Sequence, residues 1–181
     1  MADFKNKLQS NKILLLVIPS LEYNDKILQV MKELSGKSIA YVTLNKTCES
    51  LRELFQKNSI PTDKVVFVDA VSKTFKKTPD QSEGVFYCSS PGSLTELSLI
   101  ITKFLKHGFN YLIFDSVNNL APYQKKEIIS KFISSLTNKI RSSKTNAIFY
   151  VSGTENDSKD IIQQVGVYAD SVVDMRKNAE D

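Results

Sequence analysis

Residues that build metal centres and nucleophilic sites are scarce in this sequence. It contains one histidine, two cysteines and no tryptophan. Cys48 and Cys88 are far apart and have no ligand cluster beside them, so we expect neither a zinc site nor a cysteine-histidine pair, and interpret both as buried or partly buried thiols. A serine hydrolase would have to use His107. This residue precedes Gly108 at a predicted helix end, where a cation favours the helix dipole, and we interpret it as structural.

Long apolar segments and runs of like charge are missing as well. The longest apolar stretch, Ile13–Ile18, is much too short to span a bilayer, and the first residues, MADFKNKLQSN, have no hydrophobic signal-peptide core. The net charge of +4 comes from 24 Lys and Arg against 20 Asp and Glu, scattered along the chain. We expect a cytoplasmic protein without membrane contact.

The chain is of a size and composition for one globular domain, with 181 residues, 41% of them apolar and 24% charged. We expect a polar lead-in over residues 1–11, a single domain over 12–176 and a polar tail over 177–181. Apolar segments alternate with amphipathic helical patterns, and most lack polar alternation, as strands covered on both faces do. The sequence predicts a three-layer α/β/α sandwich with a mainly parallel sheet of about seven strands. The predicted strands are Ile13–Ile18, Ser38–Thr43, Val65–Val68, Val85–Cys88, Tyr111–Asp115, Asn146–Ser152 and Ser171–Met175.

Local signals predict how several connecting segments behave. Asn24 and Thr47 are expected to cap the helices that follow the first two strands. Ser93 and Glu96 have the spacing of a capping box at the start of a later helix. The polar residues 72–83 predict a surface loop.

The stretch from Ile13 to Met31, ILLLVIPSLEYNDKILQVM, predicts a buried strand, a loop after Pro19 and a helix. In open α/β sheets, ligands bind beyond the carboxyl ends of the strands. Phosphate-binding loops occur at such a first strand-loop-helix unit, and Lys26 occupies the position of their lysine. The segments expected to meet at this edge are 19–26, 43–46, 115–119 and 152–155.

Several segments in a fixed order carry a family resemblance. These are VVFVD, VFYCSSPGSLTEL, YLIFDS and VGVYADSVVDM, and with the first strand and helix they span roughly residues 12–176. The chain resembles the RecA-like ATPases, particularly the KaiC branch and its small archaeal relatives, with Asp115 and Ser116 matching the Asp-Ser of their Walker B segment. The resemblance implies a RecA-like, P-loop-type topology, side-by-side assembly and a connection to signal transduction.

The phosphate loop departs from the pattern G-x-x-x-x-G-K-[ST]. Here the chain reads SLEYNDKI, so Ser20 and Asp25 replace both glycines, Lys26 is kept, and Ile27 replaces the hydroxyl that holds magnesium. Glu22 and Asp25 place negative charge where a triphosphate would lie, and at ~4 Å like charges repel by roughly 1–4 kcal/mol. The loop is therefore predicted to be degenerate.

The catalytic carboxylates of the family are also missing. The family places them after the second strand, where this chain has Leu44 and Asn45, and neither side chain can polarise a water as a carboxylate would. Glu49 lies further along, on a predicted helix, and could act only if the loop were rebuilt. We expect no catalytic residue and no metal ligand. The vestigial nucleotide-binding candidates are Ser20, Asp25, Lys26, Ile27, Asp115 and Ser116, although Lys26 also fits an exposed helix lysine and Asp115 a carboxylate that accepts loop N–H groups.

Three functional hypotheses follow. The first is a RecA/KaiC-like domain that no longer hydrolyses nucleotide and serves as a regulatory or protein-interaction module, with no cofactor and with a protein partner or a second copy. The alternative is a weak or composite ATP-binding protein, with magnesium, in which Lys26 and Asp115 act together with a partner subunit. A lesser alternative is a nucleic-acid-binding module, although its cations are more typical of a solvated face, so nucleic acid is not the expected partner. Those cations are Lys125, Lys126, Lys131, Lys139, Arg141 and Lys144.

Overall fold

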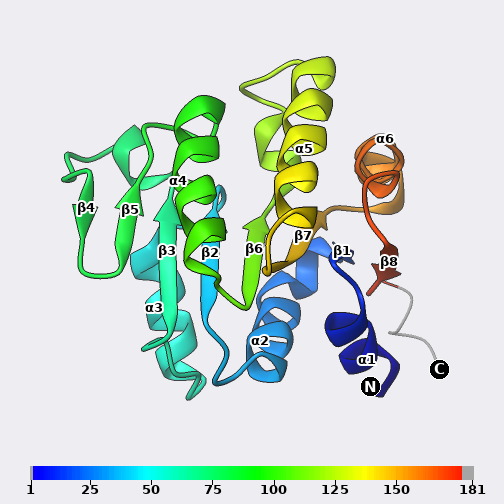
Figure 1. The fold of residues 1–181 in the computed structure, drawn as a ribbon, viewed down its shortest axis with the longest axis horizontal. Coiled ribbons are helices and arrows are strands. Elements are labelled where there is room, and N and C mark those ends of the chain that lie inside the picture. The colour runs from blue at the N-terminus through cyan, green and yellow to red at the C-terminus, as the bar shows by residue number, and fades with distance from the viewer. Residues whose placement is uncertain (1, 177–181) are drawn as a thin grey trace.

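The fold is organised around one twisted sheet, seen in a computed structural model that describes residues 2–176 (Figure 1). The sheet has eight strands in the order β4-β5-β3-β2-β6-β7-β1-β8. The tail predicted for 177–181 lies outside the described residues. The strands are β1 (Ile13–Ile18), β2 (Ile39–Thr43), β3 (Val65–Asp69), β4 (Gln81–Ser82), β5 (Val85–Tyr87), β6 (Tyr111–Asp115), β7 (Asn146–Ser152) and β8 (Ser171–Asp174).

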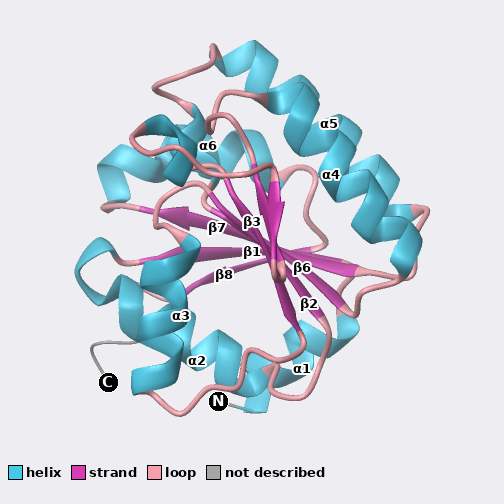
Figure 2. Ribbon diagram, turned by 90° about the vertical axis from the view of Figure 1, so that its left-hand side faces the viewer, coloured by secondary structure: helices cyan, strands magenta, loops and turns pink. Residues whose placement is uncertain are grey.

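Helices connect the strands and cover both faces of the sheet. Buried side chains of α1, α2 and α3 pack on one face, and those of α4, α5 and α6 pack on the other (Figure 2). The helices are α1 (Ala2–Ser10), α2 (Tyr23–Glu33), α3 (Cys48–Lys57), α4 (Leu94–His107), α5 (Lys126–Arg141) and α6 (Glu155–Gly166), with short 3₁₀ helices η1 (Ser20–Glu22), η2 (Ser72–Thr74) and η3 (Val117–Leu120). None of these helices is long and apolar enough to cross a membrane.

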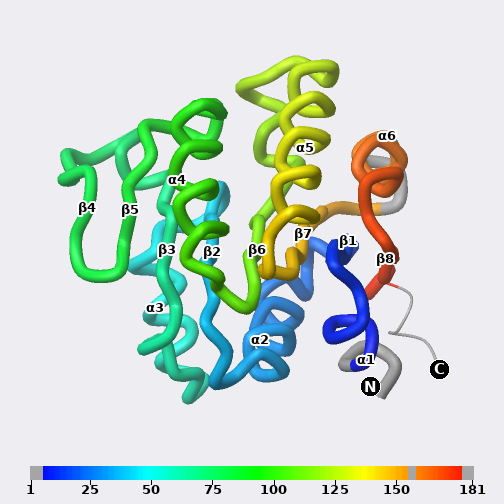
Figure 3. The backbone as a smooth tube through the Cα atoms, viewed as in Figure 1, coloured from blue at the N-terminus to red at the C-terminus, as the bar shows by residue number. Residues whose placement is uncertain are grey.

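The sheet is parallel except at one edge. The chain runs outward through β2 and β3 to β5, returns through β6 and β7, and ends with β8 beside β1 (Figure 3). Every pairing is parallel apart from β4 with β5. Apolar strands buried on both faces suit this arrangement, since α/β crossovers place helices on either side.

Strand β4 was not predicted from the sequence and lies inside the segment predicted to be a surface loop. Gln81 pairs with Phe86 and Ser82 with Val85, so the segment folds back as a hairpin. Gly84 makes the turn with φ +66°, a conformation that glycine adopts without steric cost. Two exposed polar residues show no apolar alternation, which explains why this strand left no sequence signal.

The start of α2 differs from the prediction. Asn24 is not the N-cap, because η1 runs directly into α2 and the helix begins at Tyr23. Glu22 occupies the N-cap position, and its side chain makes no capping hydrogen bond. The segment SLEYNDKI is therefore a continuous helical turn rather than an open loop.

Of the other two predicted helix caps, one is confirmed and one is wrong. Thr47 caps α3 as predicted, since its Oγ1 accepts a hydrogen bond from the Ser50 N–H over 3.1 Å. The predicted capping box at α4 is wrong, because Ser93 holds the N-cap position but its side chain makes no capping hydrogen bond. The Glu96 carboxylate accepts instead from the Ser89 N–H, 2.9 Å away. Glu96 thus ties the preceding loop to the helix.

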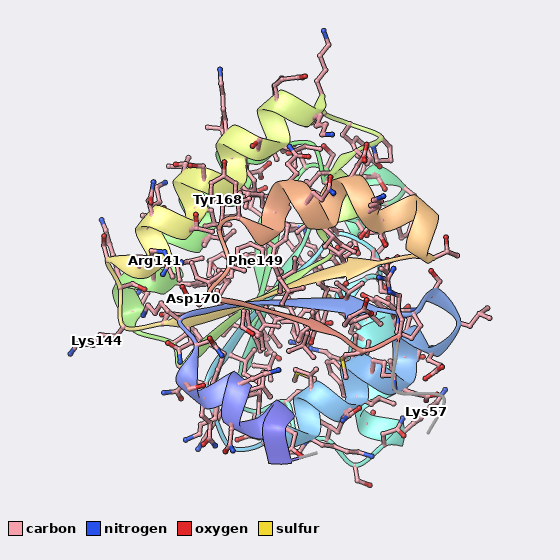
Figure 4. The ribbon with its side chains drawn as sticks, turned by 90° about the vertical axis from the view of Figure 1, so that its right-hand side faces the viewer. Lys57, Arg141, Lys144, Phe149, Tyr168 and Asp170 are labelled. Carbon is pink, nitrogen blue, oxygen red and sulfur yellow. The ribbon has the colours of Figure 1, made fainter. Side chains whose placement is uncertain are left out.

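The β8 edge is fixed by an ion pair between distant parts of the chain. Arg141, at the end of α5, donates to the Asp170 carboxylate over 2.7 Å and to the Tyr168 carbonyl over 3.1 Å (Figure 4). Asp170 also accepts from the Ile13 N–H at the start of β1. Partial burial alone would raise the pKa of Asp170, but these hydrogen bonds hold it below its ordinary value.

Candidate functional site at the carboxyl edge of the sheet

The loops expected to meet at the carboxyl edge of the sheet do so. Asn118, after β6, donates from Nδ2 to the Ser152 Oγ over 3.1 Å and accepts from the Ser152 N–H over 3.0 Å. The Leu44 N–H, after β2, donates to the Asp115 carbonyl. A polar pocket of about 300 Å³ lies among these loops, at the small end of the range for ligand pockets. It is lined by Ser20, Leu21, Tyr23, Asn24, Asn45, Lys46 and Ser152.

Asp115, the Walker B match, does not open onto this pocket. It is 0% exposed at the end of β6. The Tyr23 hydroxyl donates to Oδ1, and the Tyr41 hydroxyl donates to Oδ2 over 2.6 Å. Tyr23 is the fourth residue of SLEYNDKI, so the side chain that occupies the space in front of Asp115 comes from the segment that was compared with phosphate loops.

A third tyrosine completes the surroundings of Asp115. Tyr150 lies on β7, and Tyr41 lies on β2, the two strands that flank β6. Both rings are fully buried on the face that α2 and α3 cover. The Tyr150 hydroxyl has no hydrogen-bond partner within the described residues. We call Tyr23, Tyr41 and Tyr150 the tyrosine cage.

The tyrosine cage sets the chemistry that Asp115 can perform. Desolvation by burial raises the pKa of Asp115 well above its ordinary value, which favours the neutral carboxylic acid. Burial likewise raises the pKa values of Tyr41 and Tyr150. A magnesium ligand must be an ionised carboxylate that the ion can reach. Asp115 is shielded from solvent, and its raised pKa disfavours the ionised form that a magnesium ion would need.

The remaining loop candidates are spread over different environments. Lys26 forms an ion pair with Glu22 across one helical turn, with 3.2 Å between Nζ and Oε2, and its side chain is only 17% exposed. Ser20 and Asp25 are exposed, while Ile27 is fully buried in the core. No hydrogen bond or ion pair joins Lys26 to Asp115 in the described structure. Lys26 is thus paired with Glu22, the last residue of η1.

Ser116 is also turned inward. It is 0% exposed, and its hydroxyl donates to the side-chain oxygens of Asn118 and Asn119. The serine thus holds the turn η3, which follows β6. Its match to the Walker B segment corresponds here to a local structural role.

Comparison with known proteins bears on the fold and the family. A family model matches residues 3–180. The chain belongs to the family of unknown function DUF7090. No curated protein matches it. Among solved structures, the chain is similar to one from a study titled "Structural and biochemical analysis of a prototypical ATPase from the type III secretion system of pathogenic bacteria".

The structural match has a TM-score of 0.55 at 15% sequence identity and covers 91% of this chain and 51% of that one. The chain therefore spans about half the length of that ATPase. At this identity the likeness concerns the fold alone, because one fold supports many functions. It agrees with the prediction of an ATPase-like α/β domain built on a mostly parallel sheet.

Asp69, at the end of β3, is a second buried carboxylate at this edge that sequence reasoning did not single out. Its oxygens accept from the N–H groups of Cys48, Val71 and Ser72, each over 2.8 Å, and from the Ser72 hydroxyl over 2.7 Å. Burial alone would raise the pKa of Asp69, but these bonds lower it below its ordinary value. Asp69 joins β3 to the start of α3 and to η2. In the sequence, Asp69 ends an apolar strand, and Asp115 shows the same pattern.

Both cysteines are buried, and their thiols are poor nucleophiles. Burial raises the pKa of Cys48 to about 11 and that of Cys88 to about 12. Only the thiolate reacts as a nucleophile or binds metal. Among the side chains that the structure describes, which leave out those of residues 2–5 and 155–157, no group of three or more His, Cys, Asp and Glu could hold a metal ion.

Several of the cations proposed for nucleic-acid binding are engaged within the fold. Arg141 pairs with Asp170, and Lys139 donates to the hydroxyls of Ser98 and Thr102. Lys126 lies 3.5 Å from the Asp160 carboxylate. Lys144 extends away from the body of the protein (Figure 4). These side chains lie along the length of α5 and beyond its end rather than forming one groove.

Proposed function

We propose that this chain is an ATPase-like domain of the KaiC-like branch that no longer hydrolyses nucleotide and acts as a protein-interaction module in signal transduction. One observation carries the proposal, namely the Tyr23 hydroxyl on the fully buried Asp115. The residue that would hold magnesium is covered by the loop that would hold phosphate. Reopening the site would break this hydrogen bond and would bring Tyr23, which is only 8% exposed, into contact with water.

The interaction role is supported by apolar side chains exposed at the same edge. Leu21 in η1 is fully exposed, Phe75 after η2 is 64% exposed, and Tyr123 before α5 is 50% exposed. Each belongs to a segment that follows the carboxyl end of a strand. Scattered surface apolar residues are common, but several along one edge favour a contact with another protein. A second copy of this chain or a different protein would bury them.

Nucleotide binding is the first test. Isothermal titration of the full chain with ATP and magnesium should give no heat of binding at submillimolar concentrations, and no phosphate should be released on incubation. Measurable hydrolysis that disappears in Lys26→Ala, while the matched control Lys32→Ala on the same helix retains it, would refute the proposal.

Sedimentation velocity over a range of protein concentrations tests the self-association form of the interaction role. If two copies meet at this edge, Leu21→Asp should shift the chain toward monomer. Val167→Asp, which changes an equally apolar side chain that is 76% exposed beyond α6, should not. Equal effects of the two variants would place the contact elsewhere.

A second candidate function is weak or composite ATP binding with a partner subunit. The pocket of about 300 Å³ favours it, because Lys46 and the polar side chains of Ser20, Asn24 and Asn45 line an open site beside η1. Under this candidate, submillimolar magnesium-dependent ATP binding would appear and would be lost in Asp115→Ala. ATP binding that requires Lys46 but is indifferent to magnesium and to Asp115 would instead assign the ligand to the pocket alone.

A further inference from the structure

A separate pocket of about 420 Å³ lies at the opposite, amino-terminal edge of the sheet. It is formed where Phe104 of α4 packs against Phe86 of β5, beside Val66 of β3. The chain then turns through Gly108 toward β6 (Figure 1). Its volume falls within the usual range for sites that hold small molecules. We call it the phenylalanine pocket, defined by Ser38, Phe86, Lys103, Phe104, His107 and Phe109.

Three aromatic rings form the apolar part of the phenylalanine pocket. Phe104 packs edge-on against Phe86 with 5.1 Å between ring centroids, and against Phe109 with 5.4 Å. Phe104 is buried in the core, so it anchors the other two rings, which are partly exposed. Such T-shaped contacts fix ring positions, so the apolar surface is preformed. It suits an aromatic or branched apolar group.

The polar part of the phenylalanine pocket carries one lysine and one histidine. Lys103 and His107 lie four residues apart on α4, hence on one face of the helix, and both are exposed. Neither side chain takes part in a hydrogen bond or ion pair with any described residue. Ser38 is already committed, since its hydroxyl donates to the Asn110 Oδ1 and accepts from the Asn110 N–H. No residue that lines the pocket is acidic.

We propose that the phenylalanine pocket binds a small organic carboxylate whose body is aromatic or branched and apolar. The body lies against Phe86, Phe104 and Phe109, and the carboxylate faces the Lys103 ammonium with His107 beside it. Apolar pockets with a few convergent polar groups are the usual form of small-molecule sites, and the polar groups here select an anion. This site is independent of the carboxyl edge and of the function proposed for it.

Three probes with the same apolar body and different charge test the proposal. The full chain, labelled with ¹⁵N, is titrated with 4-phenylbutyrate, 4-phenyl-1-butanol and 4-phenylbutylamine while amide shifts are followed. The carboxylate should give saturable shifts confined to the amides around Phe86 and residues 103–109. The ammonium should bind at least about tenfold more weakly, because it meets Lys103 as a like charge. Equal binding of the carboxylate and the ammonium, or shifts centred elsewhere, would overturn the proposal.

Matched lysine variants identify the charged contact. Lys103→Met should weaken the binding of 4-phenylbutyrate by about fivefold, which is the scale of a solvent-exposed ion pair. It should leave the affinity for 4-phenyl-1-butanol unchanged. Lys106→Met removes a charge from the same helix turn, but Lys106 does not line the phenylalanine pocket. This variant should leave the affinities for both ligands unchanged. Because both side chains are exposed, the variants should fold. Equal weakening by the two variants would show a general charge effect and would overturn the assignment of Lys103.

Discussion

Replacing Asp115 with asparagine should stabilise this protein at neutral pH. In the unfolded chain the carboxyl group ionises near its ordinary pKa of 3.8, whereas in the folded chain burial keeps it protonated to a much higher pH. The unfolded state therefore releases a proton that the folded state retains. Stability falls as the pH rises above 3.8, and the fall continues until the pKa in the folded state is passed.

The size of the effect follows from the width of that pH window. Each pH unit within it lowers the free energy of unfolding by about 1.4 kcal/mol, so over the roughly 3 units up to pH 7 the loss is at most about 4 kcal/mol. Asparagine has no proton to release. Its amide oxygen can still accept from one tyrosine hydroxyl, and its NH₂ group can donate to the other. Asp115→Asn should therefore raise the free energy of unfolding at pH 7, by no more than about 4 kcal/mol.

Urea unfolding followed by circular dichroism at several pH values between 4 and 8 measures this effect. The advantage of Asp115→Asn over the wild type should be small at pH 4 and should grow toward pH 7. Asp25→Asn, which changes an exposed carboxylate on the same side of the protein, should show no such growth. An advantage that shrinks as the pH rises would mean that Asp115 is ionised in the folded protein, and the reasoning from the tyrosine cage would fail.

Three further predictions concern other parts of the fold. Asp69→Asn should lower the free energy of unfolding by about 2–4 kcal/mol at pH 7, because the buried Asp69 carboxylate accepts four hydrogen bonds. In the wild type this stabilisation is present above pH 3.8 and is lost as the pH falls through the lowered pKa of the folded state. Measuring the free energy of unfolding across an acid titration checks this. Gly92→Ala should destabilise by about 1–3 kcal/mol in thermal unfolding, because its Cβ would lie 2.7 Å from the Tyr123 Cβ, and adding Tyr123→Ala should recover part of the loss. Iodoacetamide at pH 8 should alkylate Cys48 and Cys88 at least about a hundredfold more slowly in the native protein than in urea, as mass spectrometry would show; rapid native alkylation would contradict their burial and raised pKa values.

Local patterns predicted most of the elements because they depend on neighbours in the sequence. Apolar runs without polar alternation predicted the long strands, and Thr47 predicted its own cap. Strand β4 (Gln81–Ser82) was not predicted, because its two exposed polar residues carry no periodic signal. The cap at Asn24 was wrong because η1 continues into α2, which begins at Tyr23.

Residue types at fixed spacing were enough to show that SLEYNDKI departs from the phosphate-loop pattern at both glycines and at the magnesium-binding hydroxyl. The sequence also indicated that Asp115 ends a buried strand at the carboxyl edge. Only the tertiary structure decided what faces Asp115. Tyr23, Tyr41 and Tyr150 come from α2, β2 and β7, and they meet because β6 lies between β2 and β7 in the sheet. The phenylalanine pocket arises in the same way, from a helix end and two strands whose residues are separated in the sequence and adjacent in space.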